Sequence, residues 1–276
     1  GLAPTLEPAR LRANWVVFLL PHMEQSNLYG EFDLDVPIDD EANAEARKTP
    51  LPVMLCPTDT YNSEPYSRAL VAGVEGHTYA RGNYGLNFGP NDSCFTFQPM
   101  CEDGFHTATE DLENTNMLVW GSGISGLNTG FRLRDFSNGL SRMVAVDELR
   151  AGIDPIDPRG VWALGFAGSS ITVRHGKHQT GNASTINTLS TTSDDIMGCV
   201  ELVAKFTEQG MVDLGMPCAT SAVPGNHQAT ARSMHEGGAH VLMLDGSVHF
   251  VSENVNPDVW HNMHSKDADD DFNLPF

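Results

Sequence analysis

The stretch "SMHEGGAHVLMLDGSVHFVSENV", from Ser233 to Val255, decides the fold. In it, Asp245-Gly246 joins two short segments of alternating apolar residues. Asp-Gly in this setting is a strong signal for a β-hairpin with a two-residue type I′ turn, whose central residues both have positive φ. We therefore predict a hairpin that turns at Asp245-Gly246. Its expected buried side chains are Val241, Met243, Val248 and Phe250.

Histidines around this hairpin raise the question of a metal or catalytic site. A metal would need several ligands among His235, His240, His249 and Asp245 to converge at about 2 Å, with the preceding loop folded back. In the simpler interpretation, His235 bonds to backbone in the "HEGG" loop, the glycines allow close chain approach and Asp245 acts within the turn. We favour this second interpretation, with no metal and no catalytic residue. The structural motif then comprises His235, Gly237, Gly238, Asp245, Gly246 and Ser247.

Composition and charge restrict the class of protein. The 276 residues are 40% hydrophobic and include 26 glycines and 16 prolines, which is typical of a loop-rich β or α+β protein. A formal net charge of −20 argues against binding to nucleic acid or to an anionic membrane surface. The longest apolar run, Trp15 to Pro21, is far shorter than the roughly 20 residues of a membrane span. We predict one α+β domain over residues 1–276. It has an antiparallel sheet, few helices and insertions at about 90–116 and 174–230.

Five cysteines indicate possible disulfides. Cys94 and Cys101 bracket a turn-rich loop, and Cys199 and Cys218 flank a predicted helix and its exit. Each pair could form a disulfide, which leaves Cys56 over. Oxidised pairs are typical of secreted and surface proteins, so this pattern predicts an extracytoplasmic location.

Three further segments carry secondary-structure signals. Residues 51–57 ("LPVMLCP") and 141–149 ("SRMVAVDEL") have the composition of buried strands. Residues 193–210 ("SDDIMGCVELVAKFTEQG") predict a helix that Ser193 or Asp194 caps and that Gly210 ends.

Other ligand and catalytic patterns give little support for a site. The chain has no G-x-S-x-G or H-E-x-x-H pattern, so we predict that it is not an enzyme. Tyr84, Trp120 and Trp162 lie near glycines and could stack on a sugar, although such aromatics commonly fill a core. Calcium could bind where acidic loops converge, but no residues with calcium-loop spacing stand out and no cofactor is predicted.

Several motifs together indicate a family. His235, nine further residues and Asp245-Gly246 form an H-x(9)-D-G pattern. This pattern resembles the C-terminal hallmark of a planctomycete family of pilin-like proteins of unknown function. Other segments resemble the same family in order: "WVVFLLPHMEQSNLY" from Trp15, "CPTD" from Cys56, "NYGLNFG" from Asn83, "NGLSRMVAVDE" from Asn138, and "DPRGVWA" from Asp157. Asn138 stands where the family has Asp, and Arg142-Met143 replaces Asn-Thr.

The resemblance implies a type IV pilin- or pseudopilin-like head with no catalytic role, membrane-anchored before assembly and then surface-exposed or secreted. The prepilin leader and most of the apolar helix expected from it are absent from the printed chain. The resemblance implies that the partners are copies of the chain or related subunits, joined through that helix. It also implies that the cysteine partner of Cys56 belonged to the missing helix. The alternative is an extracellular protein that binds a small molecule or glycan, a label also attached to this family.

Overall fold

The computed structural model describes residues 12–70, 76–90, 106–107, 119–120, 122–176, 184–220, 228–268 and 272–276. The side chains of residues 70, 106–107, 119–120 and 127 are not described. Within the described ranges, no helix combines the length and apolar character needed to cross a bilayer.

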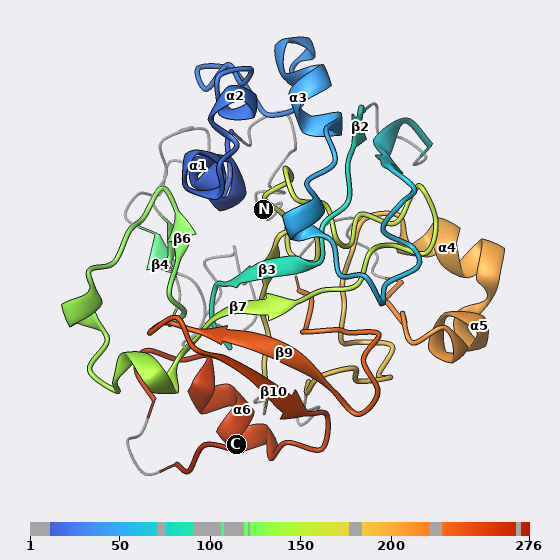
Figure 1. Ribbon diagram of the computed structural model, residues 1–276. Helices are drawn as coiled ribbons and strands as arrows, with labels where there is room; N and C mark the ends of the chain where they lie inside the picture. The colour runs from blue at the N-terminus through green and yellow to red at the C-terminus, as the bar shows by residue number, and fades with distance from the viewer. Residues whose placement is uncertain are drawn as a thin grey trace.

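A five-stranded sheet lies at the centre of the molecule (Figure 1). Its strand order is β10-β9-β7-β3-β8, and neighbours are antiparallel except for the parallel pair β3 and β8. The strands are β3 (Tyr84–Asn87), β7 (Val144–Glu148), β8 (Ile171–Thr172), β9 (Gly238–Met243) and β10 (Val248–Ser252). The mostly antiparallel sheet and the short helices confirm the predicted α+β class.

Smaller elements surround this sheet. β1 (Tyr66–Ser67) pairs with β2 (Thr78–Tyr79), and β4 (His106–Thr107), β5 (Val119–Trp120) and β6 (Gly126–Leu127) form a three-stranded sheet. The α-helices are α1 (Trp15–Leu19), α2 (Ser26–Tyr29), α3 (Ala44–Lys48), α4 (Cys199–Phe206), α5 (Glu208–Asp213) and α6 (Pro257–Met263). The 3-10 helices are η2 (Leu20–Met23), η3 (Glu41–Asn43), η4 (Pro52–Met54), η5 (Arg68–Leu70), η6 (Leu133–Asp135) and η7 (Leu140–Arg142).

The hairpin of β9 and β10 is present, but its turn differs from the prediction. Met243 N–H donates to Ser247 O and Gly246 N–H donates to Met243 O, which makes a three-residue loop of residues 244–246. Gly246 has φ of 91°, whereas Asp245 is not among the described residues with positive φ. The turn is therefore a type I turn that ends on a left-handed glycine, as three-residue hairpin loops commonly do.

This extra loop residue changes the register of β10. Val241 pairs with His249, and Ala239 pairs with Val251. A shift of one residue exchanges the two faces of a strand. Val241 and Met243 are buried as predicted, but Val248 and Phe250 are 62% and 43% exposed, and the buried residue of β10 is Val251 instead.

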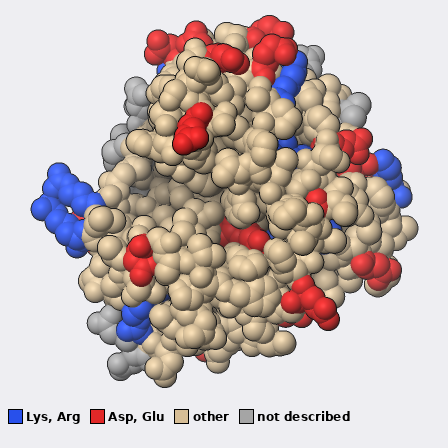
Figure 2. Space-filling view, in the orientation of Figure 1, with Lys and Arg blue, Asp and Glu red and all other residues tan. Residues whose placement is uncertain are grey.

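The buried face of this hairpin packs on α6 (Figure 1). Trp260 and Met263 of α6 join the cluster formed by Val241, Met243 and Val251. A second core lies under α1, α2 and α3, where Trp162 is fully buried with Val16, Val17 and Leu20. The space-filling view shows acidic side chains gathered over α2 and α3, together with a hollow near the middle of the face, over β3 and β7 (Figure 2).

Two predicted elements take another form. The segment 51–57 is not a strand: it begins with η4, which leaves Leu51, Met54 and Cys56 buried. The predicted helix of residues 193–210 starts only at Cys199, after Gly198. Asp194 is no helix cap, because its carboxylate binds two buried arginines, and Gly210 lies within α5.

The structure tests one of the two predicted disulfides. Cys199 and Cys218 form a disulfide that joins α4 to the segment after α5, as predicted. Cys56 is a free, buried thiol among the described residues. Cys94 and Cys101 lie outside the described residues, so that pairing stays a prediction.

Candidate functional site

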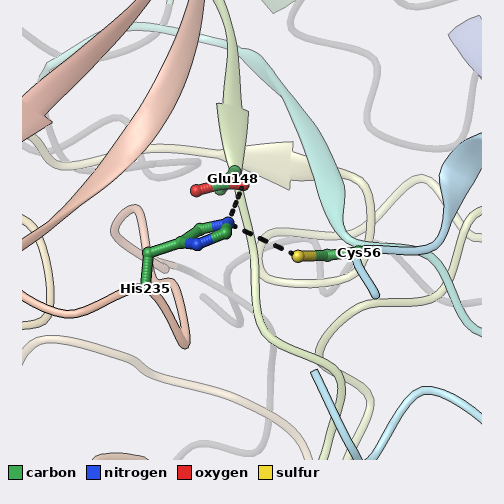
Figure 3. A group of neighbouring side chains, drawn as sticks. All are labelled: Cys56, Glu148 and His235. Atoms are coloured by element: carbon green, nitrogen blue, oxygen red, sulfur yellow. Dashed lines mark hydrogen bonds and ion pairs between the residues drawn. The ribbon is translucent and has the colours of Figure 1, made fainter. Parts of the chain in front are cut away.

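Three side chains from distant parts of the chain meet beside β7 (Figure 3). His235 Nε2 lies 3.3 Å from Glu148 Oε1 and 3.6 Å from Cys56 Sγ. One donor atom from each residue falls within 4.8 Å of the other two. Cys56 and Glu148 are buried, whereas 27% of the His235 side chain is exposed. Sulfur, imidazole nitrogen and carboxylate oxygen thus share one partly accessible place.

Cys56 is held there by a buried amide. Asn83 Oδ1 accepts a hydrogen bond from Cys56 N–H, and Asn83 Nδ2 donates to Leu149 O and to Asp59 Oδ2. The same Asp59 oxygen accepts from Ala151 N–H. This network ties the cysteine loop to the start of β3 and to the chain that leaves β7, so the thiol has a fixed position.

Glu148 is the last residue of β7, and its two carboxylate oxygens have separate partners. Oε2 accepts a hydrogen bond of 2.7 Å from His240 N–H. Oε1 faces His235 Nε2 and lies 3.5 Å from His240 Nδ1. Tyr84 pairs with Glu148 across the sheet. Burial, Glu148 and Cys56 together raise the pKa of the Tyr84 phenol above its ordinary value.

The loop that carries His235 is fixed by Arg232 and Ser233. Arg232 N–H donates to Glu148 O, and His235 N–H donates to Ser233 Oγ. The Arg232 guanidinium donates to both oxygens of Asp194, which also accepts from Arg159. Burial alone would raise the pKa of Asp194, but Arg232 and Arg159 outweigh burial and lower this pKa below 3.8. A buried ion network therefore positions the chain that leads into His235.

A second cluster of titratable side chains includes Asp147, which precedes Glu148 in β7. The other two members are His175 and His264. His264 Nε2 is 3.0 Å from Asp147 Oδ1, and His264 Nδ1 is 2.7 Å from Trp260 O. The ring of His175 stacks on that of His264 with centroids 3.8 Å apart. All three side chains are completely buried. This arrangement ties α6 to the sheet and offers no route to a solute.

A pocket of about 430 Å³ opens beside the same loop. Its lining includes Arg150, Asn187, Gly215, Ser233 and Glu253. Arg150 is almost fully buried, and burial lowers its pKa below the ordinary value despite the nearby Asp59. Its Nη1 donates to Leu214 O, while its Nε has no acceptor among the described residues.

The predicted structural residues of the hairpin have local roles. Asp245 Oδ1 accepts from Ser247 N–H and Ser247 Oγ, and these hydrogen bonds lower the pKa of Asp245. Gly237 has a positive φ of 81°. At Gly238, a Cβ atom would lie 2.1 Å from Val251 O, so the strands can meet there only at a glycine.

The other residues considered from sequence have different positions. His235 turns its ring toward Glu148 and Cys56, whereas the sequence favours a backbone contact in the "HEGG" loop. Trp162 is completely buried and donates from Nε1 to Thr49 O, which leaves no ring face for a ligand. Tyr84 lies beside the site, and the Trp120 side chain lies outside the described residues.

Sequence reasoning missed that Cys56 and Glu148 are the partners of His235. Two signals pointed to them. Cys56 is the cysteine left without a partner, and Glu148 is the final residue of the "NGLSRMVAVDE" motif. Each motif was interpreted by itself, whereas the fold brings one residue from each of three motifs together.

A known family model matches most of the chain. Residues 3–258 match the family model SBP_bac_10, described as a protein of unknown function (DUF1559). The match supports the resemblance at the level of a family of unknown function with a solute-binding label. No curated protein and no solved structure matches the chain.

Proposed function

Since the chain belongs to the DUF1559 family of unknown function, we propose its role from its structure: a pilin-like, extracytoplasmic subunit of the cell surface or of a filament, without a catalytic role. Such a subunit transmits force between its N-terminal segment and its head. The junction between the two therefore has to be rigid.

The anchoring of α1 is the observation that carries this proposal. Asn14 Nδ2 donates to Trp162 O and to Ser170 Oγ, at 2.6 and 2.9 Å. Trp15 Nε1 donates to Ser170 O at 2.7 Å. Val16 and Val17 are fully buried. A segment that precedes residue 12 would join the head at a point locked to its core, which suits a load-bearing subunit.

Two further features support an extracytoplasmic location. The Cys199–Cys218 disulfide is typical of oxidising compartments. The net charge of −20 keeps such a head soluble at a surface.

The native N-terminus tests this proposal. We expect mass spectrometry of the protein from its own cell surface to find a processed, N-methylated residue followed by a long apolar sequence. A lipid-modified cysteine or an ordinary secretory cleavage would contradict pilin-type assembly, whatever the head binds.

The pocket beside Arg150 favours a second candidate function, capture of a small solute. Arg150 lines this pocket, and a guanidinium is suited to a carboxylate, as in an organic acid or an acidic sugar. Pockets of this size accommodate small ligands.

A thermal-shift screen with small carboxylates tests this second function. A solute that binds at Arg150 is expected to raise the melting temperature of the wild type but not that of Arg150→Met. Arg134→Met is the matched control, because 73% of the Arg134 side chain is exposed and it should keep the shift. An equal shift in both variants would place binding elsewhere.

A further inference from the structure

We propose that Cys56, Glu148 and His235 form a zinc site with three protein ligands and one open coordination position. Zinc takes cysteine sulfur, histidine nitrogen and carboxylate oxygen in a tetrahedral arrangement. The site is independent of pilin-type assembly and of the pocket at Arg150.

Two of the three distances between the donor atoms match this geometry, and the third, from Cys56 Sγ to the Glu148 carboxylate, is within 4.8 Å. Tetrahedral zinc has bonds of about 2.3 Å to sulfur, about 2.0–2.1 Å to nitrogen and about 2.0–2.2 Å to carboxylate oxygen. Such bonds separate sulfur from nitrogen by about 3.6 Å, and nitrogen from oxygen by about 3.3 Å. The separations in the structure are 3.6 Å for Cys56 Sγ to His235 Nε2 and 3.3 Å for His235 Nε2 to Glu148 Oε1.

The chemistry of His235 also favours a shared cation. Its Nε2 carries either one hydrogen or one lone pair, yet a thiol sulfur and a carboxylate oxygen both face it. One N–H group cannot point at both. A metal ion placed between the three atoms satisfies the nitrogen lone pair and neutralises a thiolate and a carboxylate that are both buried. The sulfur ligand selects zinc over calcium or magnesium, which take oxygen ligands.

Neighbouring residues fix the positions of the three donor atoms. Glu148 Oε2 is occupied by His240 N–H, which leaves Oε1 directed at the site. Cys56 is fixed through Asn83, and Thr58 Oγ1 lies 3.0 Å from its sulfur. Partners of this kind orient the ligands of metal sites. The side chains of His235 and His240 are 27% and 43% exposed, so an ion and a fourth ligand have access.

The neighbouring Asp147, His175 and His264 cluster fits a metal less well. It has no sulfur and is completely buried. Both nitrogens of His264 already face acceptors, Asp147 Oδ1 and Trp260 O. Both ring nitrogens of His264 are therefore engaged without an ion, and the absence of sulfur makes the two sites distinguishable by spectroscopy.

Cobalt substitution tests the proposal, because Co²⁺ takes zinc geometry and shows a thiolate charge-transfer band only when sulfur binds it. The metal-stripped full chain, with Cys56 as a thiol and the Cys199–Cys218 disulfide intact, is titrated with Co²⁺ and then with Zn²⁺. We expect one equivalent of Co²⁺ to produce the band and one equivalent of Zn²⁺ to remove it. Zn²⁺ is also expected to protect Cys56 from alkylation, as read by peptide mapping.

Matched variants assign the ligands. Cys56→Ser is expected to lose the band, and His235→Gln to weaken Zn²⁺ binding by more than the roughly 10- to 100-fold typical of outer-shell changes. His249→Gln, which removes a histidine outside the cluster, should bind as the wild type does. No band in the folded wild type, or a band that survives in folded Cys56→Ser, would overturn the proposal.

Discussion

Replacing Asp194 by asparagine is expected to lower the free energy of unfolding by about 3–5 kcal/mol, the usual effect of removing one partner from a buried ion pair. Asp194 is completely buried and binds the guanidinium groups of Arg159 and Arg232. Arg159 keeps Asp157 as a second partner, but Arg232 is left without a carboxylate. Urea denaturation at neutral pH measures the loss.

The pH dependence of this effect follows from the lowered pKa of Asp194. A carboxylate whose pKa is depressed by folding contributes stability above its unfolded value, 3.8, and this contribution disappears as the pH falls below that value. The difference between wild type and Asp194→Asn should therefore shrink below about pH 4. Asp213→Asn, which changes an exposed carboxylate, should alter stability by no more than about 0.5 kcal/mol. Equal effects of the two substitutions at neutral pH would contradict a structural role for the network.

The hairpin illustrates how far local sequence determines the fold. Asp245-Gly246 and the alternating pattern predict two strands and a turn, and both are present. They do not determine the loop length, because a two-residue and a three-residue loop both accept Asp-Gly. The packing of Val251 rather than Phe250 against α6 settles that choice, and α6 is a tertiary neighbour.

The candidate site was less predictable than the hairpin. His235 and Cys56 are 179 residues apart, and their contact depends on how the cysteine loop and the "HEGG" loop are both held against the end of β7. Metal-ligand patterns that can be recognised in a sequence place at least two ligands a few residues apart, whereas each of these ligands lies alone in its own segment. The sequence thus contains the donors without indicating that they meet.

The asparagines of "NYGLNFG" have a physical role that periodicity alone does not indicate. Asn87 donates to Val144 O and His264 O and accepts from Gly89 N–H. Asn83 bonds in the same way to Cys56, Asp59 and Leu149. Each side chain satisfies buried backbone groups where β3 meets irregular chain, because no sheet partner is available there.

Asn83→Ala is accordingly expected to lower the free energy of unfolding by about 2–6 kcal/mol. The substitution leaves Cys56 N–H and Leu149 O buried without their side-chain partner, and each such group costs about 1–3 kcal/mol. Asn83→Asp should be no better tolerated, since the introduced carboxylate keeps the acceptor for Cys56 but faces Asp59 and the Leu149 carbonyl. Urea denaturation of both variants measures these losses.

Asn254→Ala is the matched control, because Asn254 is exposed and its substitution should change stability by no more than about 0.5 kcal/mol. A stable Asn83→Asp variant would show that the amide does not act as a donor to Asp59 and Leu149. Because Asn83 fixes the position of the Cys56 thiol, Asn83→Ala should also weaken zinc binding by about 10- to 100-fold in whatever fraction stays folded. Loss of stability with unchanged zinc affinity would mean that the position of the Cys56 thiol does not depend on this amide. Thr58 and the chain on either side of Cys56 would then have to hold the thiol in place.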